Sequence, residues 1–157
     1  MADATAAERE QGKSIEPTVI NLRTQLVKTG RSRELLAEGE HMTFRIHCYA
    51  PGIGEHGLHA HLDEEHIFIV LDGCARFSGI NGPLPPMTKN QGIALPKGCF
   101  YEFANAGDTP LVMIRFGAGA EKVLHGRRLT PDGKPIAGRS ADKALSEPTF
   151  IEGAFFE

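Results

Sequence analysis

The sequence predicts an all-β domain built as a sandwich or a barrel. Eight or nine short apolar or alternating runs follow one another, and no long helical period lies between them. Turn signals such as Pro-Gly, Asp-Gly and Asn-Gly separate the runs. The 157 residues include 18 glycines and 10 prolines, which favours many short elements joined by turns. This length suits one domain.

The expected strands follow from these runs in chain order. TVINL and QLVKT are short and rich in β-branched residues, MTFRIHCY and GLHAH alternate, and HIFIVL is continuously apolar. ARFSGI, GIAL, CFYEFA and LVMIRF are further short runs, each bounded by glycine-containing turns. Together they cover residues 18–22, 25–29, 42–49, 57–61, 66–71, 75–80, 92–95, 99–104 and 111–116.

The run HIFIVL is apolar on both faces. A strand with one face in water alternates apolar and polar residues, so this run does not fit that position. We expect one face to line the barrel interior and the other to be covered by a second sheet or by a partner subunit.

The two ends of the chain differ from the middle. Residues 1–17 are polar and rich in Ala and Glu, which predicts a flexible N-terminal arm before a barrel at 18–119. Residues 120–157 form a C-terminal extension that turns polar and then ends in FIEGAFFE. These last aromatic residues are too apolar for a free tail, so we expect the extension to dock on the barrel or on a partner subunit.

Composition narrows the possible partners and the compartment. Seventeen basic and 20 acidic residues give a net charge of −3, which predicts no binding to nucleic acid or to an anionic membrane. There is no apolar run of bilayer length and no secretory h-region. Three widely separated cysteines, Cys48, Cys74 and Cys99, argue against a disulfide framework and for the cytoplasm. A small-molecule substrate is the expected partner.

The stretch GLHAHLDEEH carries the strongest chemical signal. Side chains two apart on a strand share a face, so His59 and His61 converge on one point and can share a cation. His66 begins the next expected strand and can supply a third imidazole across the hairpin. Glu65 points the other way in a regular strand, although a bulge at the turn would exchange the two. A polar pocket without a metal is the alternative.

Two motifs in this order resemble those of the cupin superfamily, at residues 54–73 and 92–105. His59, His61 and Gly73 match the first motif, and Gly92, Pro96, Gly98 and Asn105 match the second with a shorter first spacing. The resemblance implies a jelly-roll barrel that holds a metal ion at the inner end of a pocket. It also implies pairing through outer strands, so we expect a homodimer.

The chain departs from the cupin pattern at two of the four ligand positions. His66 stands at the usual glutamate position, and Glu65 fits only the shorter spacing. Tyr101 stands at the usual histidine position. Tyr101 is therefore a metal ligand as phenolate, a catalytic acid or base, or a space-filling residue. Glu65 is either a ligand or a group that orients a histidine, whereas Asp63 and Glu64 are interpreted as solvated turn residues.

The run at 42–49 places Arg45, His47 and Tyr49 on one face. If this face lines the pocket, Arg45 can pair with a carboxylate or enolate of a substrate; otherwise it is surface. The same question applies to Arg115 and Glu102.

The resemblance implies a metal-dependent enzyme that acts on a small oxygen-rich molecule. A three-histidine site resembles cupin dioxygenases, so a non-haem Fe(II) oxidoreductase is the leading expectation; Zn, Ni, Mn and Cu are alternatives. A second class comprises non-oxidative isomerases, lyases and cyclases that would use Tyr101 as the acid or base. The third is a non-catalytic barrel that binds small molecules.

Overall fold

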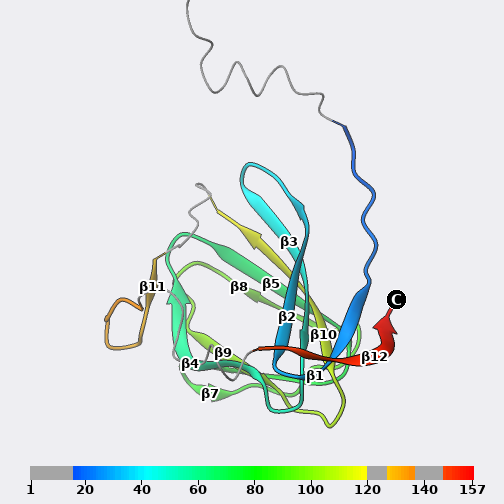
Figure 1. The fold of residues 1–157 in the computed structure, drawn as a ribbon. Helices are drawn as coiled ribbons and strands as arrows, with labels where there is room; N and C mark the ends of the chain where they lie inside the picture. Colours follow the sequence, from blue (N-terminus) through cyan, green and yellow to red (C-terminus); the bar gives the residue numbers. More distant parts are fainter. Residues whose placement is uncertain (1–15, 120–126, 137–146) are drawn as a thin grey trace, which may run out of the picture.

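The computed structural model describes residues 16–119, 127–136 and 147–157. Within these ranges the chain forms two five-stranded antiparallel sheets that face each other, and a separate two-stranded ribbon (Figure 1). The all-β jelly-roll fold expected from the sequence is confirmed. No helix in the described ranges is long and apolar enough to cross a membrane.

The first sheet has the order β2-β3-β10-β5-β8, and the second has the order β11-β4-β9-β6-β7. The strands of the first are β2 (Arg31–Glu38), β3 (Met42–Tyr49), β10 (Leu111–Ala118), β5 (Glu65–Asp72) and β8 (Gly92–Leu95). Those of the second are β11 (Arg128–Leu129), β4 (Gly54–His61), β9 (Tyr101–Asn105), β6 (Ala75–Gly79) and β7 (Gly82–Pro83). The remaining ribbon pairs β1 (Thr24–Thr29) with β12 (Thr149–Phe156).

The main core fills the space between the two sheets. Strand alternation sends every second side chain inward, so aromatic rings from both sheets meet there. Phe68 of β5 lies 5.5 Å from Phe77 of β6 and 5.3 Å from Phe103 of β9, measured between ring centroids. All three are at least 98% buried. This apolar floor closes one end of the barrel interior and leaves polar residues at the other.

One strand assigned from the sequence is wrong, and the strand β2 was not assigned. Residues 18–22 form no strand, and Val19 is 90% exposed, because β-branched residues form a strand only where a neighbouring strand pairs with them. The strand β2 was not expected, because RSRELLAE combines helix-forming residues with charges. Its pairing with β3 imposes the extended conformation, and its place at the edge of the sheet accommodates the charges.

The run HIFIVL lies in β5, and apolar side chains stand on both faces of this strand. Phe68 and Val70 are buried inside, whereas Ile67 is 43% and Ile69 39% exposed on the other face. A groove at this strand is lined by Glu65, His66, Ile67, Ala94, Leu95, Pro96, Phe116 and Ala118. The homodimer stays a prediction, and these isoleucines are the residues of β5 that it would cover.

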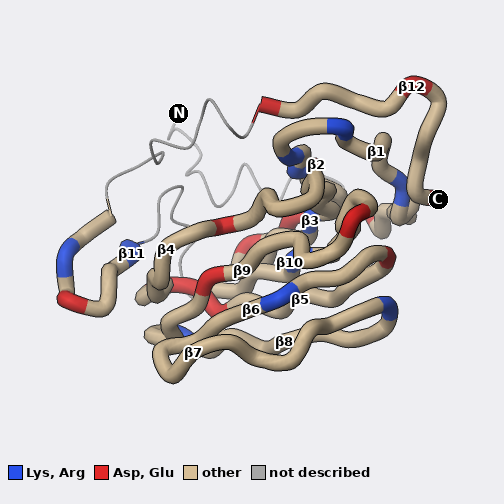
Figure 2. The backbone as a smooth tube through the Cα atoms, turned by 90° about the horizontal axis from the view of Figure 1, so that it is seen from below, with Lys and Arg blue, Asp and Glu red and all other residues tan. Residues whose placement is uncertain are grey.

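The C-terminal strand lies on the barrel, next to the strand that begins it. Figure 2 shows β12 beside β1, and Phe156 pairs with Thr24 in the register of these strands. Val27 of β1 is fully buried against Ile46 and Cys48 on the outer face of β3. Phe156 packs against the same cluster. Of the arm expected at 1–17, residues 1–15 lie outside the described residues. Residues 120–126 and 137–146 of the extension also lie outside them.

Gly54 lies where β4 approaches the backbone of β9. A Cβ atom at Gly54 would lie 2.0 Å from the carbonyl oxygen of Phe103, so one backbone would have to shift. We expect Gly54→Ala to lower the free energy of unfolding by about 2–3 kcal/mol in urea denaturation. The control is Gly79→Ala, where the nearest atom is 3.8 Å away. Equal midpoints for the two variants would contradict this packing.

Candidate metal centre

The polar end of the barrel interior brings together side chains from both sheets. His59 and His61 come from β4, His66 from β5 and Tyr101 from β9. His59 and Tyr101 are directly paired in the β4–β9 register, which places them on the same inner face. The short turn between β4 and β5 then carries His66 to the same end, as the sequence predicts.

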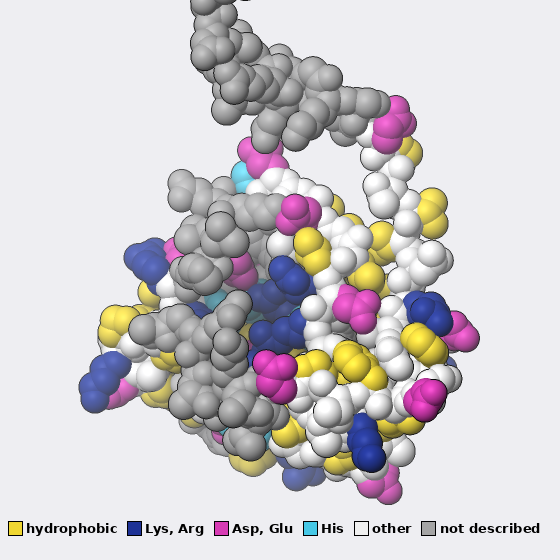
Figure 3. Space-filling view, in the orientation of Figure 1, with side chains coloured by type: hydrophobic (Ala, Val, Ile, Leu, Met, Phe, Trp, Pro, Cys, Tyr) yellow, Lys and Arg dark blue, Asp and Glu magenta, His cyan; other side chains and the backbone are white. Residues whose placement is uncertain are grey.

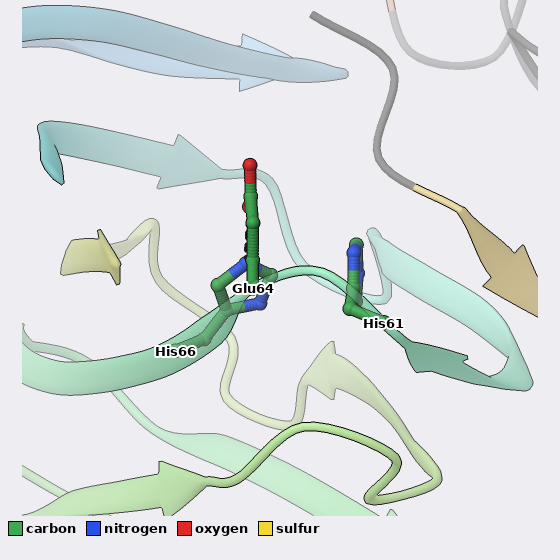
Figure 4. A group of neighbouring side chains, drawn as sticks. All are labelled: His61, Glu64 and His66. Carbon is green, nitrogen blue, oxygen red and sulfur yellow. Dashed lines mark hydrogen bonds and ion pairs between the residues drawn. The ribbon is translucent and has the colours of Figure 1, made fainter. Parts of the chain in front are cut away.

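His61, Glu64 and His66 form the group with the geometry of a metal site. Each offers one ligand atom, and these atoms all lie within 4.8 Å of one another. Figure 4 shows the three side chains rising to the same side of the turn. Glu64 Oε2 lies 2.8 Å from His66 Nε2.

The inclusion of Glu64 corrects the interpretation of this residue as a solvated turn residue. Its side chain is only 24% exposed, because it folds inward over His66 rather than into solvent. The strand period contains the signal that would have found it: Glu64 lies two residues before His66, so an extended chain places both on one face.

Arg115 of β10 fixes two members of this group. Its Nη2 lies 2.6 Å from His66 Nε2 and 3.3 Å from Glu64 Oε2. The contact with His66 and the charge of Arg115 hold the pKa of Glu64 below its ordinary value. Burial, with the charges of His66 and His59, lowers the pKa of His61 to about 3, and burial also lowers that of His66. Both imidazoles are therefore neutral at pH 7, the form that ligates metals.

His59 lies beside this group but outside it. Its ring centroid is 5.2 Å from that of His61, yet its Nε2 lies 3.5 Å from Glu55 Oε2. His59 Nδ1 contacts the carbonyl oxygen of Gly57 at 2.9 Å. The Nε2 atom is buried and has no hydrogen-bond partner. His59 is therefore not one of the three residues whose ligand atoms are grouped.

Glu65 is exposed and lies at the start of β5, on the opposite face from His66. Its side chain is not part of the group. No bulge exchanges the two residues, since β5 pairs regularly with β8 from His66 onward.

Tyr101 is buried between the histidines. Its hydroxyl lies 3.3 Å from His66 Nδ1 and 3.4 Å from His61 Nε2. Burial raises the pKa of Tyr101 well above its ordinary value, so the folded site favours the protonated phenol. These contacts suit a hydrogen-bond donor, and the roles of metal ligand and of catalytic acid or base stay predictions.

The sequence did not decide whether the polar face of β3 lines the pocket or faces solvent. In the structure this face lines the interior. Arg45, His47 and Tyr49 point inward, and Arg115 is directly opposite Arg45 in the β3–β10 register. In Figure 3 basic side chains gather at the hollowed centre of this face, with histidine beside them.

Glu55 of β4 and Arg33 of β2 are site residues that the sequence did not indicate. Arg33 Nη2 donates to Glu55 Oε1 at 2.6 Å. Burial alone would raise the pKa of Glu55, but His59 and Arg33 outweigh it and hold the pKa below its usual range. Glu55 lies four residues before His59 on β4, so the strand period places both side chains on the inner face.

The residues present fit a divalent metal ion. Two neutral imidazoles and an ionised carboxylate are a common donor set for first-row transition metals. His61, Glu64 and His66 would hold the ion.

Comparisons with known proteins agree with this architecture. The family model of the cupin domain matches residues 45–116, which contain the whole candidate group. No curated protein matches the sequence. Solved structures match in fold at low identity, and this shows the fold alone.

Three of these solved structures illustrate the likeness. The cupin domain of Schizosaccharomyces pombe Cnp3 has a TM-score of 0.53 and 15% identity, covering 59% of this chain and 67% of that one. A sugar phosphate isomerase from Silicibacter pomeroyi has 0.52 and 18%, covering 72% and 82%. A double-stranded β-helix protein of uncharacterised function from Klebsiella pneumoniae has 0.52 and 17%, covering 59% and 79%.

Proposed function

We propose that this chain, whose residues 45–116 match the cupin family model, is a metal-dependent enzyme acting on a small oxygen-rich molecule, a non-haem iron oxidoreductase of the dioxygenase type. One observation carries the proposal: two imidazoles and one carboxylate, from His61, His66 and Glu64, lie within 4.8 Å of one another. Two histidines and one carboxylate with open positions are the set that non-haem Fe(II) oxygenases use. Glu64 thus replaces the third imidazole expected from the sequence.

Fe(II) bound there would supply redox chemistry and open positions for substrate oxygens. The protein's side chains would position the metal ligands, donate to the substrate and exclude water. Arg115 holds Glu64 and His66 in place through contacts of 3.3 and 2.6 Å. The Tyr101 hydroxyl, between His61 and His66, is placed to donate a proton or hydrogen bond to a substrate oxygen. The aromatic floor around Phe68 keeps water from entering the site from below.

A non-oxidative isomerase is the second candidate, and the position of Tyr101 favours it. The hydroxyl faces two histidines inside the barrel, where a proton could be moved on a carbonyl substrate without O2. One protein of similar fold is described as a sugar phosphate isomerase.

The two candidates are separated by oxygen consumption. Protein purified without a histidine tag and loaded anaerobically with Fe(II) is expected to consume O2 with at least one member of a panel of catechols, enolisable diketones and thiols. The same protein loaded with Zn(II) should consume none, because Zn(II) has no redox chemistry. Turnover of a carbonyl substrate that continues without O2 would replace the dioxygenase by the isomerase. Absence of both metal binding and turnover would leave a small-molecule binding protein.

The cytoplasm is the compartment we propose. Its support is the state of Cys48, Cys74 and Cys99, all of which are free thiols in this fold.

A further inference from the structure

We propose that the polar end of the barrel interior binds an oxyanion group, a carboxylate or a phosphate, between the guanidinium groups of Arg33, Arg45 and Arg115. These three residues and His47 are named here the arginine site. The inference deepens the proposed function, and it rests on that function only for the claim that the bound anion is the substrate.

The three arginines come from neighbouring strands and share the inner face. Arg45 of β3 is directly opposite Arg115 of β10 in the register. Arg33 of β2 is directly opposite His47, which follows Arg45 by two residues on the same face of β3. Side chains directly opposite or diagonal across paired strands are within reach of one another. Three guanidinium groups are therefore gathered over one small area of the sheet.

Within the part of the chain that the structure describes, two of these three arginines have an acidic partner. Arg33 is paired with Glu55 and Arg115 with Glu64, whereas Arg45 has no hydrogen bond or ion pair to any residue in the described ranges. Like charges directly opposite on paired strands destabilise a sheet. Burial and the charges of Arg115 and Arg33 lower the pKa of Arg45, and Glu38 opposes them with a smaller effect. An anion bound here would relieve a repulsion that the fold otherwise maintains.

His47 adds a buried ring nitrogen to the same place. It is only 1% exposed, and its Nε2 has no hydrogen-bond partner. The other ring nitrogen, Nδ1, lies 2.8 Å from the Tyr49 hydroxyl, so Nε2 is the ring atom that remains for a ligand. A buried polar atom without a partner is costly unless a ligand supplies one.

The arginine site is continuous with the candidate metal group. Arg115 contacts both Glu64 and His66, so an anion held by Arg115 lies next to these residues. Planar guanidinium groups bind carboxylates and phosphates through paired hydrogen bonds, whereas a monatomic anion such as chloride offers no such pair. The substrate class that fits is a small acid or phosphate ester whose other oxygen atoms reach His61, Glu64 and His66.

The test uses the metal-free protein, so that anion binding is measured apart from metal binding. Malonate and inorganic phosphate are titrated by calorimetry and by thermal unfolding, against chloride at the same ionic strength. We expect one of the two oxyanions to bind and to raise the unfolding temperature, since a ligand that binds only the folded state stabilises it. Preference for malonate assigns a carboxylate, and preference for phosphate assigns a phosphate ester. No effect beyond that of chloride would overturn the inference.

Two variants make the test specific. Arg45→Gln is expected to weaken oxyanion binding at least about tenfold, because it removes one charged donor. Arg76→Gln is the matched control, an exposed arginine of β6 outside the site, and should bind as the wild type does. Without ligand, Arg45→Gln should unfold at the same or a higher temperature than the wild type, because a repulsion is lost. A clear decrease would show that Arg45 is a structural ion-pair partner and would overturn the inference.

Failure of this inference is distinguishable from failure of the proposed function. Protein that binds Fe(II) but neither oxyanion keeps the metal proposal and loses the arginine site. Protein that binds an oxyanion but no metal keeps the arginine site and loses the metal proposal.

Discussion

Replacement of His61 by alanine is expected to abolish stoichiometric metal binding. In the wild type, His61, Glu64 and His66 present three ligand atoms within 4.8 Å, and His61 is one of only two imidazoles among them. Loss of a residue that merely supports a ligand costs about 10–100-fold in metal affinity, so loss of a ligand itself should cost more. Elemental analysis after dialysis should therefore find about one ion per wild-type chain and almost none in the variant.

His56→Ala is the control for this experiment. His56 lies on the same strand β4 but is exposed, and its Nε2 contacts the Gly52 carbonyl oxygen at 3.2 Å. It should retain the wild-type metal content. His59→Ala is the informative third variant, and we expect it to retain more metal than His61→Ala. An equal loss would favour the three-histidine site predicted from the sequence, and full metal content in His61→Ala would exclude this group as the metal site.

Replacement of Phe68 by alanine is expected to cause the largest loss of stability. Phe68 is fully buried, and its ring lies 5.3 Å from Phe103, 5.5 Å from Phe77 and 6.2 Å from Tyr101 between centroids. Removing a buried phenylalanine ring leaves a cavity and costs about 3–5 kcal/mol. Urea denaturation measures this loss as a lower midpoint with an unchanged slope.

Ile69→Ala provides the comparison for Phe68→Ala. Ile69 is the next residue of β5, faces outward and is 39% exposed. Its replacement should cost about 1 kcal/mol, because little apolar area leaves a packed environment. Similar losses for the two variants would contradict the assignment of inner and outer faces on this strand.

Much of the barrel could be predicted from local sequence patterns. The strand at 42–49 was predicted with its observed bounds, because its alternation and flanking turns are both clear. The inner position of His59, His61 and His66 follows from the strand period and one hairpin. The edge strand β2 could not be predicted in this way, since only pairing with β3 makes its charged sequence extended.

The residues that sequence reasoning missed depend on contacts between distant segments. The strand period places Glu64 on the face of His66, but its contact with Arg115 joins residues 51 positions apart. Glu55 shares the inner face with His59 by the strand period, but its partner Arg33 lies on β2, a strand that the sequence did not predict. A period of two residues predicts which face a side chain takes, but it does not identify the partner on the facing sheet.

The pairing of β1 with β12 places a constraint on the order of folding during synthesis. The Thr29 and Thr149 hydroxyls that meet across this ribbon are 120 positions apart, so Phe156 can cover the cluster on the outer face of β3 only after β12 has left the ribosome. Contacts of such sequence separation close late and slowly. Until then the nascent barrel exposes the apolar outer patch of Ile46, Cys48 and Val112, and this interval is when the chain is most vulnerable to aggregation.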